Sequence, residues 1–153
     1  MPICRDVFRG DVLAIQVLDR ASIVRCSHSE KFAVISITDP QLKHPVVAPN
    51  KFCSAILQLS FSDVDERLAK LSIASPYVTP FSTLMAQMIA TFVRQEIALG
   101  VNLTVVQCDA GMSRSAGVAS ALSQYYNHDE AFFLAHYRPN RWVRRLVLEA
   151  LQN

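Results

Sequence analysis

The chain has 153 residues, a length typical of one domain, and we expect a single domain spanning residues 1–153. Apolar residues make up 51% of the sequence and charged residues only 18%, which excludes intrinsic disorder. The longest apolar runs are far shorter than the roughly 20 residues of a membrane-spanning helix, and the net charge of +2 is too small to indicate a nucleic-acid partner.

The first half of the chain contains three strand-like segments. Residues 12–18 and 32–37 are mostly apolar runs of the kind that form buried strands, and the second run ends before an Asp-Pro pair. Residues 41–51 are punctuated by prolines and predict a loop. Residues 55–61 predict a third strand.

The second half combines one further strand with several helices. Residues 80–99 carry apolar side chains at three- and four-residue steps and predict a long helix, with Pro80 in its first position and Gly100 after its end. Residues 103–107 predict a fourth strand. Further helices are predicted at residues 115–126, 129–137 and 139–151, the last with Pro139 at its start. We therefore predict an α/β fold with a central, mostly parallel sheet of four to five strands flanked by helices.

The four cysteines, Cys4, Cys26, Cys53 and Cys108, form no CxxC pair and have no histidine at zinc-ligand spacing, so we expect neither a metal site nor a cofactor. The first residues lack the apolar segment of a secretion signal. We therefore expect a cytoplasmic protein with reduced thiols. The first three cysteines are expected to be ordinary, partly or fully buried side chains.

Cys108 has a distinctive setting between the predicted strand at 103–107 and the predicted helix at 115–126. It is the only cysteine with an arginine six positions later, Arg114, which makes a C-x5-R motif. A loop wrapped around a helix N-terminus directs backbone N–H groups inward and forms a nest for a tetrahedral oxyanion. The same field favours the thiolate form of a cysteine at its base.

The residues between and after this pair suit phosphate chemistry. Arg114 offers a planar, bidentate fork for two phosphate oxygens. Gly111 permits backbone angles that other residues do not readily adopt. Ser115 can donate its hydroxyl proton to the sulfur, which makes the sulfur a better leaving group in a second step. The predicted phosphate-binding loop comprises Asp109, Ala110, Gly111, Met112, Ser113 and Arg114. We expect the Asp109 side chain to point outward, because a carboxylate beside the sulfur would oppose its ionisation.

This segment, in the form C-x-A-G-x-S-R-S, resembles the signature loop of the protein-tyrosine phosphatase superfamily, and especially dual-specificity phosphatases and their small microbial and phage relatives. The resemblance is strongest over residues 57–124. It implies a protein-tyrosine-phosphatase-like fold and metal-free hydrolysis through a phosphocysteine on Cys108, with Arg114 stabilising the transition state. The family usually has histidine before the cysteine, where this chain has Gln107, so lower activity or a higher pH optimum is expected.

The family's general acid is an aspartate that follows the third predicted strand. Asp63 matches this position best, and Asp65 is the alternative. Either aspartate could instead cap a helix beginning near Val64. The connection at residues 66–79 is longer than is usual in the family, which leaves the geometry of the loop open.

The resemblance implies a phosphorylated protein or peptide as substrate, carrying phosphotyrosine and, with dual specificity, phosphoserine or phosphothreonine. Alternatives are a phosphoinositide or an RNA 5′ phosphate, a catalytically impaired phosphate-binding module, and a rhodanese-like sulfur transferase. The loop contains no extra Lys or His, which favours a substrate with a single phosphate.

Four arginines are concentrated near the C-terminal end of the chain: Arg138, Arg141, Arg144 and Arg145. Charge runs of this kind usually form a solvated helix face, and this is the interpretation we favour. The alternative is a basic rim, reached by Arg138 and Arg141, that attracts an anionic substrate.

Overall fold

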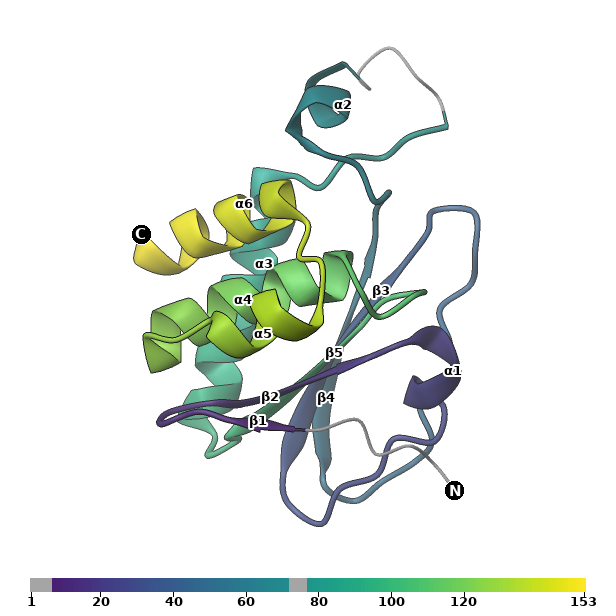
Figure 1. Cartoon of the computed structure of the whole chain (residues 1–153). Helices are drawn as coiled ribbons and strands as arrows, with labels where there is room; N and C mark the ends of the chain where they lie inside the picture. Colours follow the sequence, from purple (N-terminus) through teal and green to yellow (C-terminus); the bar gives the residue numbers. More distant parts are fainter. Residues whose placement is uncertain (1–6, 72–76) are drawn as a thin grey trace.

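The computed structural model describes residues 7–71 and 77–153, which form an α/β domain around a five-stranded sheet (Figure 1). The strands follow the order β1-β2-β5-β3-β4, and all neighbours are parallel except β1 and β2. Their bounds are β1 Phe8–Arg9, β2 Ala14–Leu18, β3 Phe32–Thr38, β4 Cys53–Ser60 and β5 Leu103–Gln107. The predicted mostly parallel sheet of four to five strands is confirmed.

Helices cover both faces of this sheet (Figure 1). The group α3–α6 lies on one face and the short α1 on the other, while α2 extends away from the sheet. Their bounds are α1 Arg20–Ile23, α2 Glu66–Leu71, α3 Thr83–Ala98, α4 Arg114–Asn127, α5 Ala131–His136 and α6 Arg141–Gln152. None of the described helices is long and apolar enough to span a bilayer.

Side chains on the two faces of the inner strands pack into two separate hydrophobic clusters. On β2, Ile15 and Val17 pack with the larger cluster under α3–α6, whereas Leu18 packs with the smaller cluster that includes Ile23 of α1. Because both faces are covered, β2, β3 and β5 are buried along their whole length. This explains why they are nearly continuous apolar runs in the sequence.

Helices α3 and α6 begin two to three residues later than predicted, after residues whose side chains cap them. Helix α3 begins after Ser82, whose side chain accepts a hydrogen bond from the Met85 N–H, and α6 begins after Asn140. The placement of Pro80 and Pro139 as first helical residues is therefore wrong, because Ser and Asn side chains satisfy the free N–H groups of the first turn. The short elements β1 and α1 were not predicted, and α2 corresponds to the helix near Val64 that was considered only as an alternative role for Asp63 or Asp65.

The carboxyl ends of the four parallel strands meet at one edge of the sheet. β5 lies between β2 and β3, with Gln107 paired in register to Leu18 and to Ser36. The segments that follow these strands begin with Asp19, Asp39, Phe61 and Cys108. In open parallel sheets this edge is where ligands usually bind, so the topology gathers four loops around the C-x5-R segment.

Candidate active site

The loop after β5 folds around the sulfur of Cys108. The Gly111 N–H donates a hydrogen bond to Sγ at 3.3 Å, and the Ser115 hydroxyl lies 3.0 Å from Sγ. Cys108 is only 1% exposed, and the loop that it begins leads into the N-terminus of the 14-residue helix α4. The positive end of the helix dipole therefore acts on the sulfur and on any anion above it.

The carbonyl groups and the N–H groups of this loop have different partners. Three carbonyls accept backbone hydrogen bonds from neighbouring segments: those of Asp109, Met112 and Ser113 accept from Arg20, Arg138 and Asn140 at 3.2, 3.0 and 2.9 Å. Most loop N–H groups, in contrast, donate to no residue in the described part of the chain; these belong to Asp109, Ala110, Met112, Ser113 and Arg114. Unused N–H groups clustered at a helix N-terminus are the donors that a tetrahedral anion needs.

Gly111 is required for this loop geometry on two grounds. Its φ of +65° lies in the left-handed region that favours glycine. A Cβ at this position would lie 2.7 Å from the backbone nitrogen of Asp19, which cannot move aside as a flexible side chain can. The close approach of the two loops thus depends on the absence of a side chain.

Arg114 is buried, with 5% exposure, and two carboxylates hold its guanidinium. Nη1 donates to Asp39 Oδ1 at 2.7 Å and to the Phe61 carbonyl at 2.8 Å, and Nη2 donates to Asp109 Oδ2 at 3.3 Å. Nε is buried and has no hydrogen-bond partner among the described residues. A buried donor without an acceptor is costly, so Nε offers a position for an oxygen of a bound anion.

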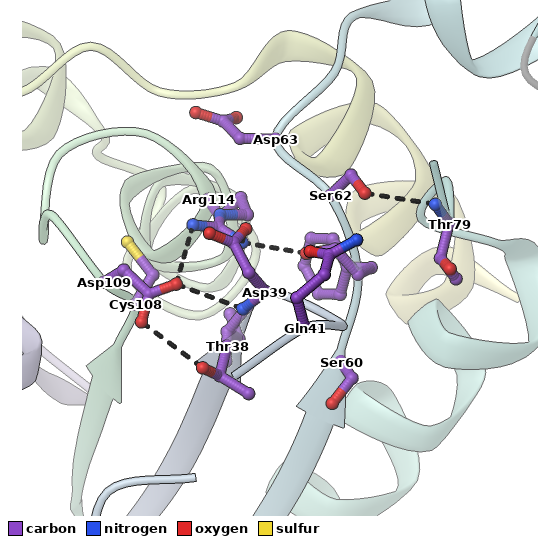
Figure 2. Close-up of polar contacts among 12 residues, drawn as sticks. Thr38, Asp39, Gln41, Ser60, Ser62, Asp63, Thr79, Cys108, Asp109 and Arg114 are labelled. Atoms are coloured by element: carbon purple, nitrogen blue, oxygen red, sulfur yellow. Dashed lines mark hydrogen bonds and ion pairs between the residues drawn. The ribbon is translucent and has the colours of Figure 1, made fainter. Parts of the chain in front are cut away.

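Asp109 does not point outward as expected. Its carboxylate accepts hydrogen bonds from the Asp39 N–H at 3.0 Å and from Arg114, and it also contacts the Thr38 hydroxyl (Figure 2). The Arg20 guanidinium donates to the same carboxylate at 3.3 Å. Burial by itself raises the pKa of this carboxyl, but the Asp39 N–H, the Arg114 charge and the other hydrogen bonds outweigh burial and hold the pKa below its usual value. Asp109 is therefore ionised, and its carboxylate holds the Arg114 guanidinium in position.

Gln107 lies beneath the loop and bonds to β3. Its Oε1 accepts from the Ser36 hydroxyl at 2.6 Å, and its Nε2 donates to the Ile37 carbonyl at 3.3 Å. The side chain is fully buried. The Gln107 amide thus joins β5 to β3 beneath the loop.

The two candidate acids have different surroundings. Asp63 is exposed, and its Oδ1 accepts from the Ser113 hydroxyl of the loop at 2.9 Å and from Asn140 Nδ2 at 2.8 Å. Asp65 accepts from the Leu68 N–H at 2.9 Å and caps α2. The structure brings Asp63, and not Asp65, to the phosphate loop. Part of the long connection at 66–79 lies outside the described residues.

Sequence reasoning missed three residues of this site. Asn140 caps α6 through its side chain, bonds Asp63, and donates its backbone N–H to Ser113. Asp39 and Arg20 hold Arg114 and Asp109 from the ends of β3 and β2. An Asn directly before a helical pattern is a recognisable cap signal, but nothing local to Asp39 or Arg20 indicates their partners.

The two other cysteines of the described residues belong to the smaller hydrophobic cluster: Cys26 lies in it and Cys53 packs against it. Cys26 is buried and Cys53 half-buried, as expected, and Cys4 lies outside the described residues. In residues 7–71 and 77–153, no group of three or more His, Cys, Asp or Glu side chains is arranged to ligate a metal ion.

No protein-family model matches the chain, and no curated protein matches its sequence. Solved structures do match. The human tyrosine phosphatase-like serine/threonine/tyrosine-interacting protein superposes with a TM-score of 0.61 at 15% identity, covering 95% of both chains. A mouse putative dual specificity phosphatase complexed with zinc tungstate gives a TM-score of 0.60 at 14% identity, covering 99% of this chain and 88% of its own. The chain has the protein-tyrosine phosphatase fold.

Other structures with the protein-tyrosine phosphatase fold match over similar lengths. PTPMT1 in complex with PI(5)P has a TM-score of 0.51 at 14% identity, covering 95% of this chain and 94% of its own. Sequence identities this low establish a common fold and no shared substrate. The predicted protein-tyrosine-phosphatase-like architecture is therefore confirmed, and the chemistry must be argued from the residues of the loop.

Proposed function

We propose that the protein is a cysteine-dependent phosphomonoester hydrolase, a protein phosphatase of the tyrosine or dual-specificity type. One observation carries the proposal: the Cys108 sulfur lies within a ring of unpaired backbone N–H groups that also contains the unpartnered Nε of Arg114. A phosphoryl group in this ring satisfies every one of these donors and stands next to the nucleophile. The reaction needs a reducing compartment such as the cytoplasm, because an oxidised sulfur cannot attack phosphorus.

In the first step the Cys108 thiolate attacks phosphorus, so that an S–P bond forms as the bond to the leaving oxygen breaks. Arg114 and the loop N–H groups receive the equatorial oxygens, on which negative charge is spread. Asp63 donates a proton to the leaving oxygen. Its Oδ1 is already held by Ser113 and Asn140, and Oδ2 is available for this transfer.

In the second step a water molecule attacks phosphorus and the S–P bond breaks, which releases inorganic phosphate. Asp63, now a carboxylate, accepts a proton from the water. The Ser115 hydroxyl, 3.0 Å from Sγ, stabilises the departing thiolate by a hydrogen bond.

The purified protein is expected to hydrolyse para-nitrophenyl phosphate in the presence of EDTA, with competitive inhibition by vanadate. The physical reason is that N–H groups and one guanidinium replace the metal ions of other phosphatases. The release of para-nitrophenol is measured spectrophotometrically. A requirement for a divalent cation, or the absence of vanadate inhibition, would contradict the proposal.

Asp63→Asn is expected to lower kcat for para-nitrophenyl phosphate by about 10²-fold, the usual contribution of a general acid, and to remove the basic limb of the pH–rate profile, which reports loss of the acid's proton. Asp65→Asn is the matched control, because it alters the cap of α2 and leaves the loop unchanged. It should change kcat by less than about 2-fold. A larger loss in Asp65→Asn than in Asp63→Asn would reverse the assignment.

Two other functions have some support. PTPMT1, in complex with PI(5)P, shares the fold and keeps a phosphoinositide substrate in consideration. The human relative named tyrosine phosphatase-like keeps a phosphate-binding module in consideration. Release of phosphate from phosphotyrosine peptides but not from phosphatidylinositol phosphates supports the protein phosphatase, and vanadate binding without any turnover supports the binding module.

A further inference from the structure

A basic hollow of about 750 Å³ lies between α5 and α6, beside the proposed active site. Its walls carry one glutamate, Glu130, and four arginines: Arg138, Arg141, Arg144 and Arg145. We refer to this surface as the arginine hollow. The proposed catalytic residues Cys108, Arg114 and Asp63 do not line it, so the hollow is distinct from the phosphate-binding ring.

Only part of the positive charge of the arginine hollow is neutralised within the chain. Arg144 pairs with Glu130 at 2.6 Å, and Arg145 pairs with Glu66 at 3.2 Å. Arg138 and Arg141 are exposed, and in the described part of the chain neither has a carboxylate partner. Two guanidinium groups are therefore available to an external anion.

Backbone contacts connect the arginine hollow to the phosphate loop. The Arg138 N–H donates to the Met112 carbonyl at 3.0 Å, and the Asn140 N–H donates to the Ser113 carbonyl at 2.9 Å. These carbonyls face away from the ring of N–H groups, so the hollow lies on the outer side of the loop. An anion bound there must be a different group from the phosphate that is hydrolysed.

We propose that the arginine hollow binds a second anionic group of a polypeptide substrate, a carboxylate or a phosphate on a residue near the phosphorylated one. This inference rests on the proposed phosphatase activity and specifies its substrate class. A polypeptide fits better than a phosphoinositide headgroup, because an extended chain can pass over the outer rim of the loop, whereas the phosphates of a headgroup are confined to one small ring. Leu134 and Pro139, which also line the hollow, provide apolar contact for the intervening residues.

The test compares three phosphotyrosine peptides that are identical except for one flanking position, which carries glutamine, glutamate or phosphothreonine. For the wild-type protein, kcat/KM at low salt should be about 5- to 10-fold higher for the two anionic peptides than for the glutamine peptide. The preference should shrink at high salt because exposed charges are screened. In Arg138→Gln/Arg141→Gln, it should fall to within about 2-fold, with unchanged turnover of para-nitrophenyl phosphate.

Arg25→Gln/Lys31→Gln is the matched control, because it removes the same charge from two exposed side chains outside the hollow. It should keep the preference. Equal loss in both double variants, or no preference in the wild-type protein, would overturn the inference. The inference would also be overturned if Arg138→Gln/Arg141→Gln lost binding to phosphatidylinositol phosphate vesicles but kept the peptide preference.

Failure of the proposed function is recognised separately, by the absence of para-nitrophenyl phosphate hydrolysis in the wild-type protein. In that case the same three peptides, labelled with fluorescein, are compared by binding anisotropy. Tighter binding of the two anionic peptides, lost in Arg138→Gln/Arg141→Gln, supports the hollow as an anion site. Equal affinities for the three peptides refute it.

Discussion

Replacing Cys108 with serine is expected to lower turnover of para-nitrophenyl phosphate by about 10⁴-fold or more, while vanadate still binds. A serine hydroxyl is a far weaker nucleophile than a thiolate, so the S–P bond has no effective substitute. Only the Gly111 N–H bonds to the sulfur. N–H groups of neighbouring segments donate to the loop carbonyls, and two carboxylates bind the Arg114 guanidinium, so the rest of the ring should keep its position. Initial rates and calorimetric titration with vanadate measure the two effects.

Cys53→Ser is the matched control for this experiment. Cys53 is a half-buried free thiol on β4, and burial, with a contribution from Glu96, raises its pKa. It is therefore a poor nucleophile and should tolerate the same substitution with little loss of activity. If Cys108→Ser kept a tenth of the wild-type rate, or if Cys53→Ser lost as much activity as Cys108→Ser, the nucleophile would have to be reassigned.

The strands and the phosphate loop are predictable from sequence because their signals are local. The buried strands β2, β3 and β5 are apolar runs, and β5 was predicted with the bounds that the structure has. The C-x5-R segment, Gly111 and the following helix also stand within one short stretch. In contrast, two residues of β1 and one turn of α1 are too short to produce a periodic pattern.

The support around Arg114 is not predictable from sequence because it depends on strand order. Asp39 contacts Arg114 only because β5 lies directly beside β3, which places distant segments at one edge of the sheet. The outward orientation expected for Asp109 was wrong for the same reason: the Thr38 hydroxyl and the Asp39 N–H, which donate to its carboxylate, lie at the end of another strand, β3. The expectation took into account only the repulsion between the Asp109 carboxylate and the neighbouring sulfur, because these two groups are adjacent in the sequence and the donors on β3 are not.

Arg114→Lys is expected to lower kcat by about 10³-fold and to weaken vanadate binding. Lysine keeps the positive charge, so an ion pair with Asp39 or Asp109 can persist and the fold should survive. It has no planar fork and no Nε–H, however, and Nε–H is the donor of Arg114 that has no partner among the described residues and can bind a phosphate oxygen. Thermal unfolding of the variant, followed together with its activity, separates a loss of function from a loss of folded protein.

Arg20→Lys is the matched control, because Arg20 is the second arginine on the Asp109 carboxylate, with Nη1 at 3.3 Å from Oδ1. Its other contacts are with Thr38 and the Lys43 carbonyl, so it supports the site from outside the ring of N–H groups. An exposed or half-buried ion pair of this kind contributes about 1 kcal/mol or less, which limits the expected loss of kcat to less than about 10-fold. If both variants lost activity equally, charge balance around Asp109 would explain the effect. If only Arg114→Lys lost activity, the unpartnered Nε would be identified as the group that binds phosphate.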